Sequence, residues 1–359
     1  MLFLIVIAFT IYRRKKILSH KQTLTLKTTP TKSAHVITSH DIRAIAGEDV
    51  ISTQLDLARA YIEIGKKTIG AKNTGSRDQT RQSDSAPRSP PIIEKSVLTM
   101  IRIALGIEYD GNGFHGWQRQ SVLSTVQSSL EDALSNIADE SIELFCAGRT
   151  DAGVHAIGQV VHFDTNAMRD SRAWIMGANA HLPSGISVRW AQEVDEPFHA
   201  RYSALSRCYR YIIYNYPSRP AILARKVTWY YEPLVVENMH SAAQYLLGEN
   251  DFSSFRASEC QSKTAMRNIQ KIEVTRHQDF VVIEIQANAF LHHMVRNIVG
   301  VLKRIGAGFE KPTWAKEVLE AKDRRMAAET APPDGLYLLR VNYPEKYAIP
   351  APKEQILFL

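Results

Sequence analysis

The order of strand-like and helix-like segments between residues 101 and 194 is the strongest constraint on the fold of this chain. From Ile101 to Ile107 every second residue is isoleucine or leucine, which is the period-2 pattern of a strand. A helix is expected at 126–137, where Val126, Leu130 and Leu134 share one face. Further strands are expected at 141–147, 158–165 and 186–194, and a second helix at 171–181. This order, strand–helix–strand–strand–helix–strand, is that of a split ferredoxin-like unit.

The second half of the chain repeats the theme. Strands are expected at 207–215, 227–232, 268–276, 280–289 and 335–341, and helices at 236–247, 291–305 and 314–324. In the 207–215 strand, Cys208 and Arg210 lie on one face and Tyr209 and Tyr211 on the other. We therefore expect an α+β fold with two ferredoxin-like halves, 100–205 and 206–359, whose antiparallel sheets are flanked by helices around a central cleft. Such a cleft could hold a polymer substrate.

Residues 1–99 differ from the rest of the chain in charge. Of the formal charge of +7, they hold 16 Lys+Arg and 8 Asp+Glu, a net of +8, and the remaining residues hold 28 and 29, a net of −1. The apolar run at 2–12 is followed by four basic residues but falls short of the roughly 20 residues of a membrane helix. It lacks a preceding basic region and a small-residue cleavage site, which argues against a signal peptide. A truncated membrane span is the sharper alternative.

A helical pattern at 55–65 resembles the first helix of a tetratricopeptide unit, and is also similar to the tail of FimV-type bacterial membrane proteins. One such helix has no neighbour to stack against and would be marginal alone. Residues 70–92 are rich in small polar and charged residues and are typical of a disordered linker. Because Met100 directly precedes the first strand, we interpret residues 1–99 as an upstream extension that arose from a gene fusion or a misassigned start.

Arginine and cysteine usage indicate a class of partner and a compartment. Residues 100–300 contain 15 Arg and 3 Lys. Arginine binds phosphate with two parallel hydrogen bonds and stacks on bases, so this bias favours an RNA partner. The three cysteines, Cys146, Cys208 and Cys260, show no C-x-x-C spacing. They are typical of reduced cytosolic thiols, and they argue against a disulfide framework or a structural zinc site.

The segment from Cys146 to Ala156 is the strongest candidate for a functional loop. It joins two expected strands, and Gly148 and Gly153 bracket its tip at Asp151. Arg149 lies two residues before this aspartate, and a carboxylate beside an arginine stays ionised, which suits a nucleophile or an electrostatic stabiliser. The alternative is an aspartate that only caps its own turn.

Gly111, Gly113 and Gly116 spell the G-x-G-x-x-G pattern of a dinucleotide-binding turn, with Glu131 twenty residues beyond the first glycine. We reject this interpretation on two grounds. The helix of such a motif begins within the glycines, whereas the nearest expected cap is Ser124 with Gln127 as its capping-box partner. The acidic residue should end a second strand, whereas Glu131 lies inside the expected helix.

Three motifs and one supporting segment together resemble the TruA family of tRNA pseudouridine synthases, in the family's order, from about residue 101 to the C-terminus. They are Gly148-Arg149-Thr150-Asp151-Ala152-Gly153-Val154-His155, Arg207-Cys208-Tyr209-Arg210-Tyr211 and Phe290–Gly300, with Tyr109-Asp110-Gly111 and Gly116-Trp117-Gln118 before them. The resemblance implies that Asp151 is the nucleophile and that Arg296 forms a salt bridge with it. It also implies that Tyr209 stacks on the target uracil and assists proton transfer, with Arg207 and Arg210 bringing charge to the same region. An aromatic residue packed into the core is the plainer interpretation of Tyr209.

The resemblance further implies a set of tRNA contacts. Arg149 is the candidate to fill the stack that an extruded base vacates. The other implied contacts, each of which alone would be an ordinary polar loop residue, are Arg169, His199, Arg201, Tyr202, Gln261 and Lys263. The adjacent His292 and His293 invite a metal interpretation. We reject it because neighbours on a helix point about 100° apart and would not chelate one ion together.

By resemblance, the chain is an isomerase that converts uridine to pseudouridine at positions 38 to 40 of the tRNA anticodon stem-loop. Attack by Asp151 on C1′ of the ribose and attack on C6 of the base both stay open. The resemblance implies a cytoplasmic homodimer that needs no cofactor or metal and has no stable membrane partner. Two alternatives are a non-catalytic RNA-binding module and a membrane-tethered scaffold in which residues 1–99 are the functional part.

Overall fold

The structure is a computed structural model that describes residues 100–352. The chain divides into two units, Met1–Ile92 and Ile93–Leu359, and the description below concerns the second. The apolar run at 2–12, the helical pattern at 55–65 and the linker at 70–92 lie outside the described residues. Among residues 100–352, no helix combines the length and the apolar character needed to cross a membrane.

The first half contains the expected ferredoxin-like unit. Its elements are β1 (Ile101–Tyr109), α4 (Val126–Ala138), β2 (Phe145–Cys146), β3 (His155–Thr165), α5 (Ser171–His181) and β4 (Ile186–Val194). The strands lie in the order β4-β1-β3, with β2 pairing to β3. The expected bounds of α5 and β4 are confirmed, whereas the strand expected at 141–147 is reduced to the two residues of β2.

The expected cap of α4 is wrong by one residue. Thr125 is the N-cap, and its hydroxyl accepts a hydrogen bond from the Ser128 backbone N–H. The Ser128 side chain in turn accepts from the backbone N–H of Thr125, which completes a capping box with a serine in place of the expected glutamine. Gln127 instead reaches the backbone N–H of Arg119, 3.1 Å from its Oε1 atom.

The second half repeats the ferredoxin-like order. Its elements are β5 (Ser206–Asn215), β6 (Thr228–Tyr230), α6 (Val236–Gln244), β7 (Gly248–Asp251), β8 (Met266–His277), β9 (Phe280–Ala287), α7 (Met294–Gly306), α8 (Trp314–Ala321) and β10 (Leu336–Asn342). Four 3₁₀ helices lie at Gly111–Gly113, Ser253–Phe255, Arg324–Met326 and Glu345–Tyr347. The order β10-β5-β9-β8 matches that of β4-β1-β3-β2 in the first half. The strand β7 is absent from the sequence prediction, and α7 begins three residues later than expected.

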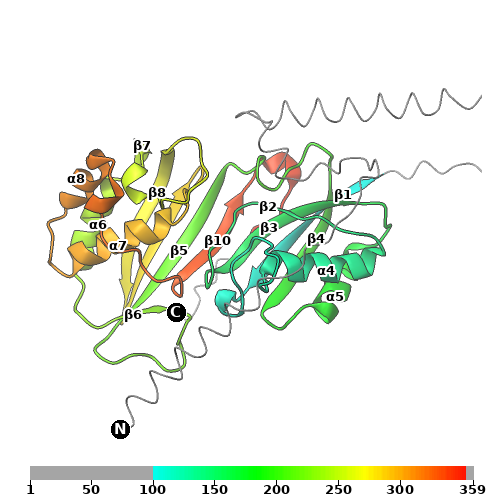
Figure 1. Cartoon of the computed structure of the whole chain (residues 1–359), viewed down its shortest axis with the longest axis horizontal. Helices are drawn as coiled ribbons and strands as arrows, with labels where there is room; N and C mark the ends of the chain where they lie inside the picture. Colours follow the sequence, from blue (N-terminus) through cyan, green and yellow to red (C-terminus); the bar gives the residue numbers. More distant parts are fainter. Residues whose placement is uncertain (1–99, 353–359) are drawn as a thin grey trace, which may run out of the picture. The chain divides into compact units, whose positions relative to one another are not determined.

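Strand β10 joins the two halves into one sheet, in the order β4-β1-β3-β10-β5-β9-β8-β7. It pairs antiparallel to β5, with Leu338 opposite Tyr209, and parallel to β3, with Tyr337 opposite His155. The two halves have the expected antiparallel sheets except at the short parallel pair β5–β6, and the β3–β10 pair that joins them is parallel. Figure 1 shows β10 between β3 and β5. This pairing brings the loop before β3 beside the second half.

The helices bury the side of β5 that carries Tyr209, Tyr211 and Ile213. These three residues belong to the main core, which extends through both halves. In the first half α5 packs on β4 and α4, and in the second half α6 packs on β8 and α7 (Figure 1). The opposite side of β5 carries Ile212 in a small separate cluster with Val227. The predicted division of the 207–215 strand into two faces is confirmed.

Candidate active site

The loop with Asp151 at its tip is fixed at both ends by the sheet. Ala147 donates its backbone N–H to the Val160 carbonyl at 2.8 Å, so the loop leaves the sheet directly after β2. A turn follows in which the Val154 N–H donates to the Asp151 carbonyl at 3.1 Å. Gly153 has a φ of +79°, a left-handed conformation that favours glycine. The tight turn holds Asp151 directly before β3, the strand of the first half that pairs with β10.

The glycine-rich segment after β1 packs against this loop. We call the contacts that Gly116, Trp117 and Tyr109 make with Thr150 the seat of the loop. Gly116 has a φ of +86°, and a Cβ atom there would lie 2.9 Å from the Thr150 carbonyl oxygen. The next residue, Trp117, donates its backbone N–H to that same carbonyl at 3.0 Å. From β1, the Tyr109 hydroxyl lies 2.8 Å from Thr150 Oγ1. Of the three glycines of the apparent dinucleotide motif, Gly116 therefore supports the residue next to Asp151, and Gly111 lies against Gly153 and Val154 in the same loop.

Arg207 binds the start of the loop at Ala147. Its guanidinium is buried and donates to the Ala147 carbonyl from Nε at 3.2 Å and from Nη2 at 3.0 Å. It also donates to the Asn288 carbonyl at 2.9 Å, and burial lowers the pKa of Arg207. Arg210 lies on the opposite face and pairs with Glu284 at 2.9 Å. The expectation that both arginines bring charge beside Tyr209 is thus wrong for Arg210, because strand residues alternate between faces.

The expected ion pair between Arg296 and Asp151 is present. Arg296 Nη1 lies 2.9 Å from Asp151 Oδ2, and the two side chains are 14% and 23% exposed. The guanidinium is itself oriented, because its Nε donates to the Ala331 carbonyl at 2.8 Å. Arg296 belongs to α7, so a helix of the second half supplies the cation for a carboxylate of the first half.

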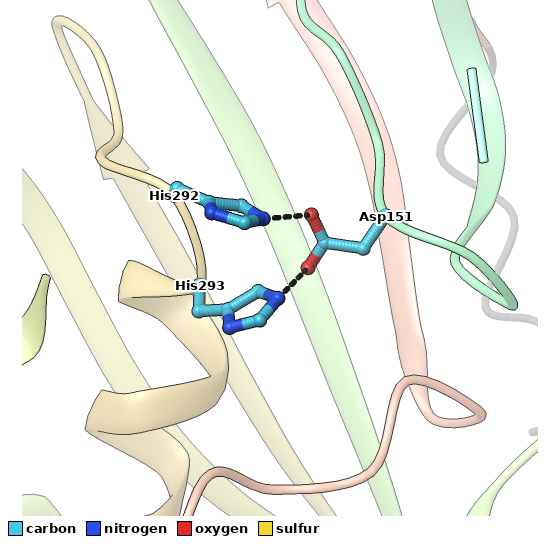
Figure 2. Close-up of side chains that lie close together, drawn as sticks. All are labelled: Asp151, His292 and His293. Carbon is cyan, nitrogen blue, oxygen red and sulfur yellow. Dashed lines mark ion pairs between the residues drawn. The ribbon is translucent and has the colours of Figure 1, made fainter. Parts of the chain in front are cut away.

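His292 and His293 also face Asp151, which sequence reasoning missed. The Nε2 atom of His292 lies 3.5 Å from Asp151 Oδ1, and that of His293 lies 3.4 Å from Oδ2 (Figure 2). The expectation that two helical neighbours diverge is wrong here, because α7 begins only at Met294 and His293 has a φ of +61°. This left-handed residue turns the backbone so that both rings lie side by side, with centroids 4.0 Å apart. Burial is the main cause that lowers the pKa of His293.

Tyr209 lies beside the same loop. Its ring is 7% exposed and packs edge-on against Phe290, with centroids 5.0 Å apart. Its hydroxyl is 3.6 Å from the position that a Cβ atom on Gly148 would occupy. Burial raises the pKa of Tyr209, and the negative charge of Asp151 raises it further. Tyr209 is therefore a neutral phenol across the physiological pH range.

Four of the predicted tRNA contacts lie near the Asp151 loop. Arg149 is exposed within the loop itself. The turn before β5 carries the exposed Arg201 and Tyr202, and the Tyr202 ring lies 4.4 Å from that of His199. Arg207 connects this turn to the loop, because it donates to the carbonyl of Arg201 as well as to that of Ala147.

The remaining predicted contacts are more remote. Gln261 and Lys263 are exposed in the segment that precedes β8, and Cys260 in that segment accepts a hydrogen bond from the His292 N–H at 3.4 Å. Arg169 lies directly before α5 and donates to the neighbouring Met168 carbonyl at 3.2 Å. Within residues 100–352 it makes no described contact with the Asp151 loop.

Comparison with known proteins gives one consistent result. A family model described as tRNA pseudouridine synthase matches residues 106–203 and 242–344. The chain is 57% identical over 266 residues to the tRNA pseudouridine synthase A of Shigella boydii, covering 74% of this chain and 98% of that protein. The Escherichia coli protein of the same name gives the same values, and a second Escherichia coli sequence is 58% identical over 258 residues, covering 72% and 96%.

Proposed function

The chain belongs to the tRNA pseudouridine synthase family, and we propose that it isomerises uridine to pseudouridine at positions 38 to 40 of the tRNA anticodon stem-loop. The observation that carries this proposal is the Asp151 carboxylate, which a loop presents beside Tyr209 while Arg296 holds it at 2.9 Å. The Shigella boydii and Escherichia coli relatives, of which the match covers 98%, carry tRNA pseudouridine synthase in their names.

The reaction rearranges bonds without a second reactant. The N1–C1′ glycosidic bond breaks, the uracil rotates and a C5–C1′ bond forms. A proton then leaves C5 while N1 gains one, so electrons and atoms balance within the nucleotide and the solvent. The protein has to supply a nucleophile, a way to hold the detached base and a path for the C5 proton.

We assign the nucleophilic role to Asp151. Arg296 hydrogen-bonds Oδ2, whereas the contact of Oδ1 with His292 Nε2, at 3.5 Å, is longer, which favours Oδ1 as the attacking oxygen. The ion pair also fixes the carboxylate in one orientation, because Arg296 is anchored at its other edge by the Ala331 carbonyl. An oriented, ionised carboxylate needs little reorganisation before it attacks.

Tyr209 is the residue to hold the base. As a neutral phenol it can stack through its ring and donate a hydrogen bond through its hydroxyl. Its raised pKa disfavours a phenolate that would take the C5 proton. We therefore assign Tyr209 to positioning and hydrogen-bond donation.

The target uridine lies in a stem and must leave the stack before Asp151 reaches it, at a cost of a few kcal/mol. Arg149 is exposed two residues from the nucleophile, which suits it to fill the gap. The exposed Arg201 and Tyr202, with the half-buried His199 beside them, form an aromatic and cationic patch next to the loop. We propose this patch as the nearest RNA contact, with Gln261, Lys263 and Arg169 contacting more distant parts of the tRNA.

The test is to incubate the full chain with an unmodified tRNA transcript that has uridines at positions 38, 39 and 40. Carbodiimide labelling and primer extension then map pseudouridine at single-nucleotide resolution. We expect stops at these positions and at no other uridine of the transcript. Tight binding without any stop would contradict the proposal and favour a non-catalytic RNA-binding module.

We further propose that the protein is a cytoplasmic homodimer. Both assignments rest on the resemblance to the TruA family. The cytoplasmic one is also supported by the three free cysteines, as expected in a reducing compartment. Sedimentation of the full chain should give twice the monomer mass of 40.5 kDa. Cell fractionation should find the activity in the supernatant. A sediment at monomer mass, or retention with membranes as expected for a tethered scaffold, would contradict these two assignments.

A further inference from the structure

Asp151, His292 and His293 form a cluster of potential metal ligands. One ligand atom from each, the two Nε2 nitrogens and a carboxylate oxygen, lies within 4.8 Å of the other two. The three side chains point toward one another from the loop before β3 and the segment before α7 (Figure 2). Catalysis by Asp151 does not by itself require two imidazoles at this place.

The backbone holds these ligands in place. His293 is the N-cap of α7 and its φ of +61° turns its ring alongside that of His292. The His292 backbone is tied down in turn, because its N–H donates to Cys260 Sγ and its carbonyl accepts from the Ala257 N–H at 3.1 Å. The two imidazoles therefore face Asp151 before any ion arrives, which reduces the conformational cost of binding.

The donor set selects the class of ion. Two imidazole nitrogens with one carboxylate suit Zn²⁺, Co²⁺, Ni²⁺ or Cu²⁺, whereas Mg²⁺ and Ca²⁺ prefer oxygen ligands. Tetrahedral bonds of about 2.0–2.1 Å place neighbouring ligand atoms about 3.4 Å apart. His292 Nε2 lies 3.5 Å from Oδ1 and His293 Nε2 lies 3.4 Å from Oδ2, so each imidazole is at about this spacing from one oxygen of the carboxylate. One ligand atom from each of the three residues lies within 4.8 Å of the other two, so side-chain rotations have to bring them closer for all three to bind one ion.

The surroundings allow entry and limit affinity. His292, His293 and Asp151 are 36%, 29% and 23% exposed, so an ion can reach the cluster and keep a water as its fourth ligand. Arg296 donates a hydrogen bond to the carboxylate and so orients it, as groups behind a metal ligand commonly do. Its positive charge also repels a cation, which favours moderate affinity over permanent occupation.

We propose that Asp151, His292 and His293 bind one divalent transition-metal ion of the zinc class in the RNA-free protein. The ion and a target nucleotide compete for the same carboxylate, so binding of the ion inhibits the enzyme reversibly. The binding site stands on the geometry alone, and the inhibition rests on the proposed function.

Binding is tested on the full chain after treatment with a chelator. Zn²⁺ is titrated by calorimetry, and Co²⁺ by the visible absorption that tetrahedral coordination gives it. The variants are His292→Gln and His293→Asn, since asparagine tolerates a left-handed backbone. The matched control is His181→Gln, an exposed histidine at the end of α5.

We expect one saturable equivalent of moderate affinity in the wild type and in the His181 variant, with affinity at least about tenfold weaker in the other two. Mg²⁺ at the same concentration should not compete. Equal affinity in all four proteins, or no stoichiometric binding by the wild type, would overturn the site. Circular dichroism confirms that each variant is folded.

Inhibition is measured as the Zn²⁺ concentration that halves the rate of pseudouridine formation. We expect this concentration to rise at least about tenfold in His292→Gln and to stay unchanged in His181→Gln, with a chelator restoring the wild-type rate. A bound ion that leaves the rate unchanged would overturn the inhibitory role. If the chain forms no pseudouridine at all, the proposed function fails while the binding titration still decides the site.

Discussion

At the scale of single residues, the site depends on how one carboxylate is held. Asp151 receives Arg296 on Oδ2 at 2.9 Å and faces two imidazoles at 3.4 and 3.5 Å. The Arg207 guanidinium donates a hydrogen bond to the Ala147 carbonyl at the start of the same loop. Each of these side chains comes from the second half of the chain, whereas Asp151 comes from the first. The position of the Asp151 carboxylate is therefore set in part by contacts between the halves.

Substitutions of Arg296 test whether the ion pair with Asp151 is needed for activity. Arg296→Met keeps most of the side-chain volume but leaves the Asp151 carboxylate unpaired. Breaking a mostly buried ion pair costs about 3 kcal/mol. If the transition state loses this stabilisation, kcat/KM falls about 100-fold. Arg296→Lys keeps the charge without the planar fork and should fall about tenfold. Arg304→Met, on the exposed side of the same helix, is the control and should keep the wild-type rate. Equal rates in Arg296→Met and Arg304→Met would show that the ion pair is dispensable.

The motifs predicted that Asp151, Tyr209 and Arg296 belong to one site, and the structure places Arg296 beside Asp151 and Tyr209 beside the same loop. Their roles in catalysis stay predictions. The sequence was misleading for the histidines next to Arg296. Helical periodicity extends smoothly across 291–305, but His293 adopts a left-handed conformation that no periodicity reveals. Arg210 was misplaced for a simpler reason. Its motif neighbours Arg207 and Tyr209 lie on the other face of the strand, which the alternation already indicated.

At the scale of elements, the seat of the Asp151 loop is built by backbone contacts. Gly116 and Trp117 both approach the Thr150 carbonyl, and the side chain of Thr150 meets Tyr109 from β1. The α7 helix supplies Arg296 from the other side. Local pattern predicted the bounds of α5 and β4 correctly. It missed the four-residue β7, because so short a strand is specified by its pairing with β8 and not by its own sequence.

Gly116→Ala tests the seat. A Cβ atom would lie 2.9 Å from the Thr150 carbonyl and would also strain a backbone with a φ of +86°. We expect a loss of about 1–3 kcal/mol in the free energy of unfolding and a fall in kcat, because the loop must shift. In Gly113→Ala a Cβ atom meets nothing within 4 Å, so this control should match the wild type. The prediction fails if both variants unfold at the same denaturant concentration.

The ion pair between β5 and β9 predicts a pH dependence of stability. Arg210 and Glu284 lie directly opposite one another and are 12% and 17% exposed. Burial opposes ionisation of Glu284, but the hydrogen bond and charge of Arg210 outweigh it and lower the pKa of Glu284 below its usual 4.5. A carboxyl whose folded pKa is lowered stabilises the fold above the unfolded pKa and loses that contribution as pH falls through the folded value.

We therefore expect Glu284→Gln to lower the free energy of unfolding at pH 7 by about 3 kcal/mol. The difference from the wild type should shrink as the pH falls below about 4. Urea unfolding at a series of pH values measures it. Glu320→Gln removes an exposed pair with Lys316 and should change stability by less than about 0.5 kcal/mol. A deficit in Glu284→Gln that is constant down to pH 3 would contradict the linkage.

At the scale of the whole molecule, β10 makes the two halves one working unit. It is the last strand among residues 100–352, yet it lies in the middle of the sheet, between β3 and β5. Sequence patterns predicted two ferredoxin-like orders and a final strand. They did not predict that this strand would lie parallel to β3, because no local periodicity specifies a partner some 180 residues away. The predicted cleft between the halves stays a prediction.

Truncation tests which part of the chain is needed. Every assigned site residue lies after Met100, and the second compact unit begins at Ile93. The fragment Met100–Leu359 should therefore fold with the circular dichroism of a mixed α and β protein. It should also form pseudouridine at the rate of the full chain. Aggregation of the fragment, or a loss of more than about tenfold in kcat/KM, would show that residues 1–99 contribute to the enzyme.

Tritium release from tRNA labelled with 5-³H-uridine tests most directly whether the chain forms pseudouridine with Asp151 as its nucleophile. Loss of the C5 proton accompanies every conversion of uridine to pseudouridine, so the full chain should release tritium with turnover. Asp151→Asn preserves shape but removes the nucleophile, and it should release none above background while binding the tRNA with nearly unchanged affinity. Release by Asp151→Asn at about a tenth of the wild-type rate or more would contradict the role of Asp151 as nucleophile. No release by the wild type would contradict the proposed activity.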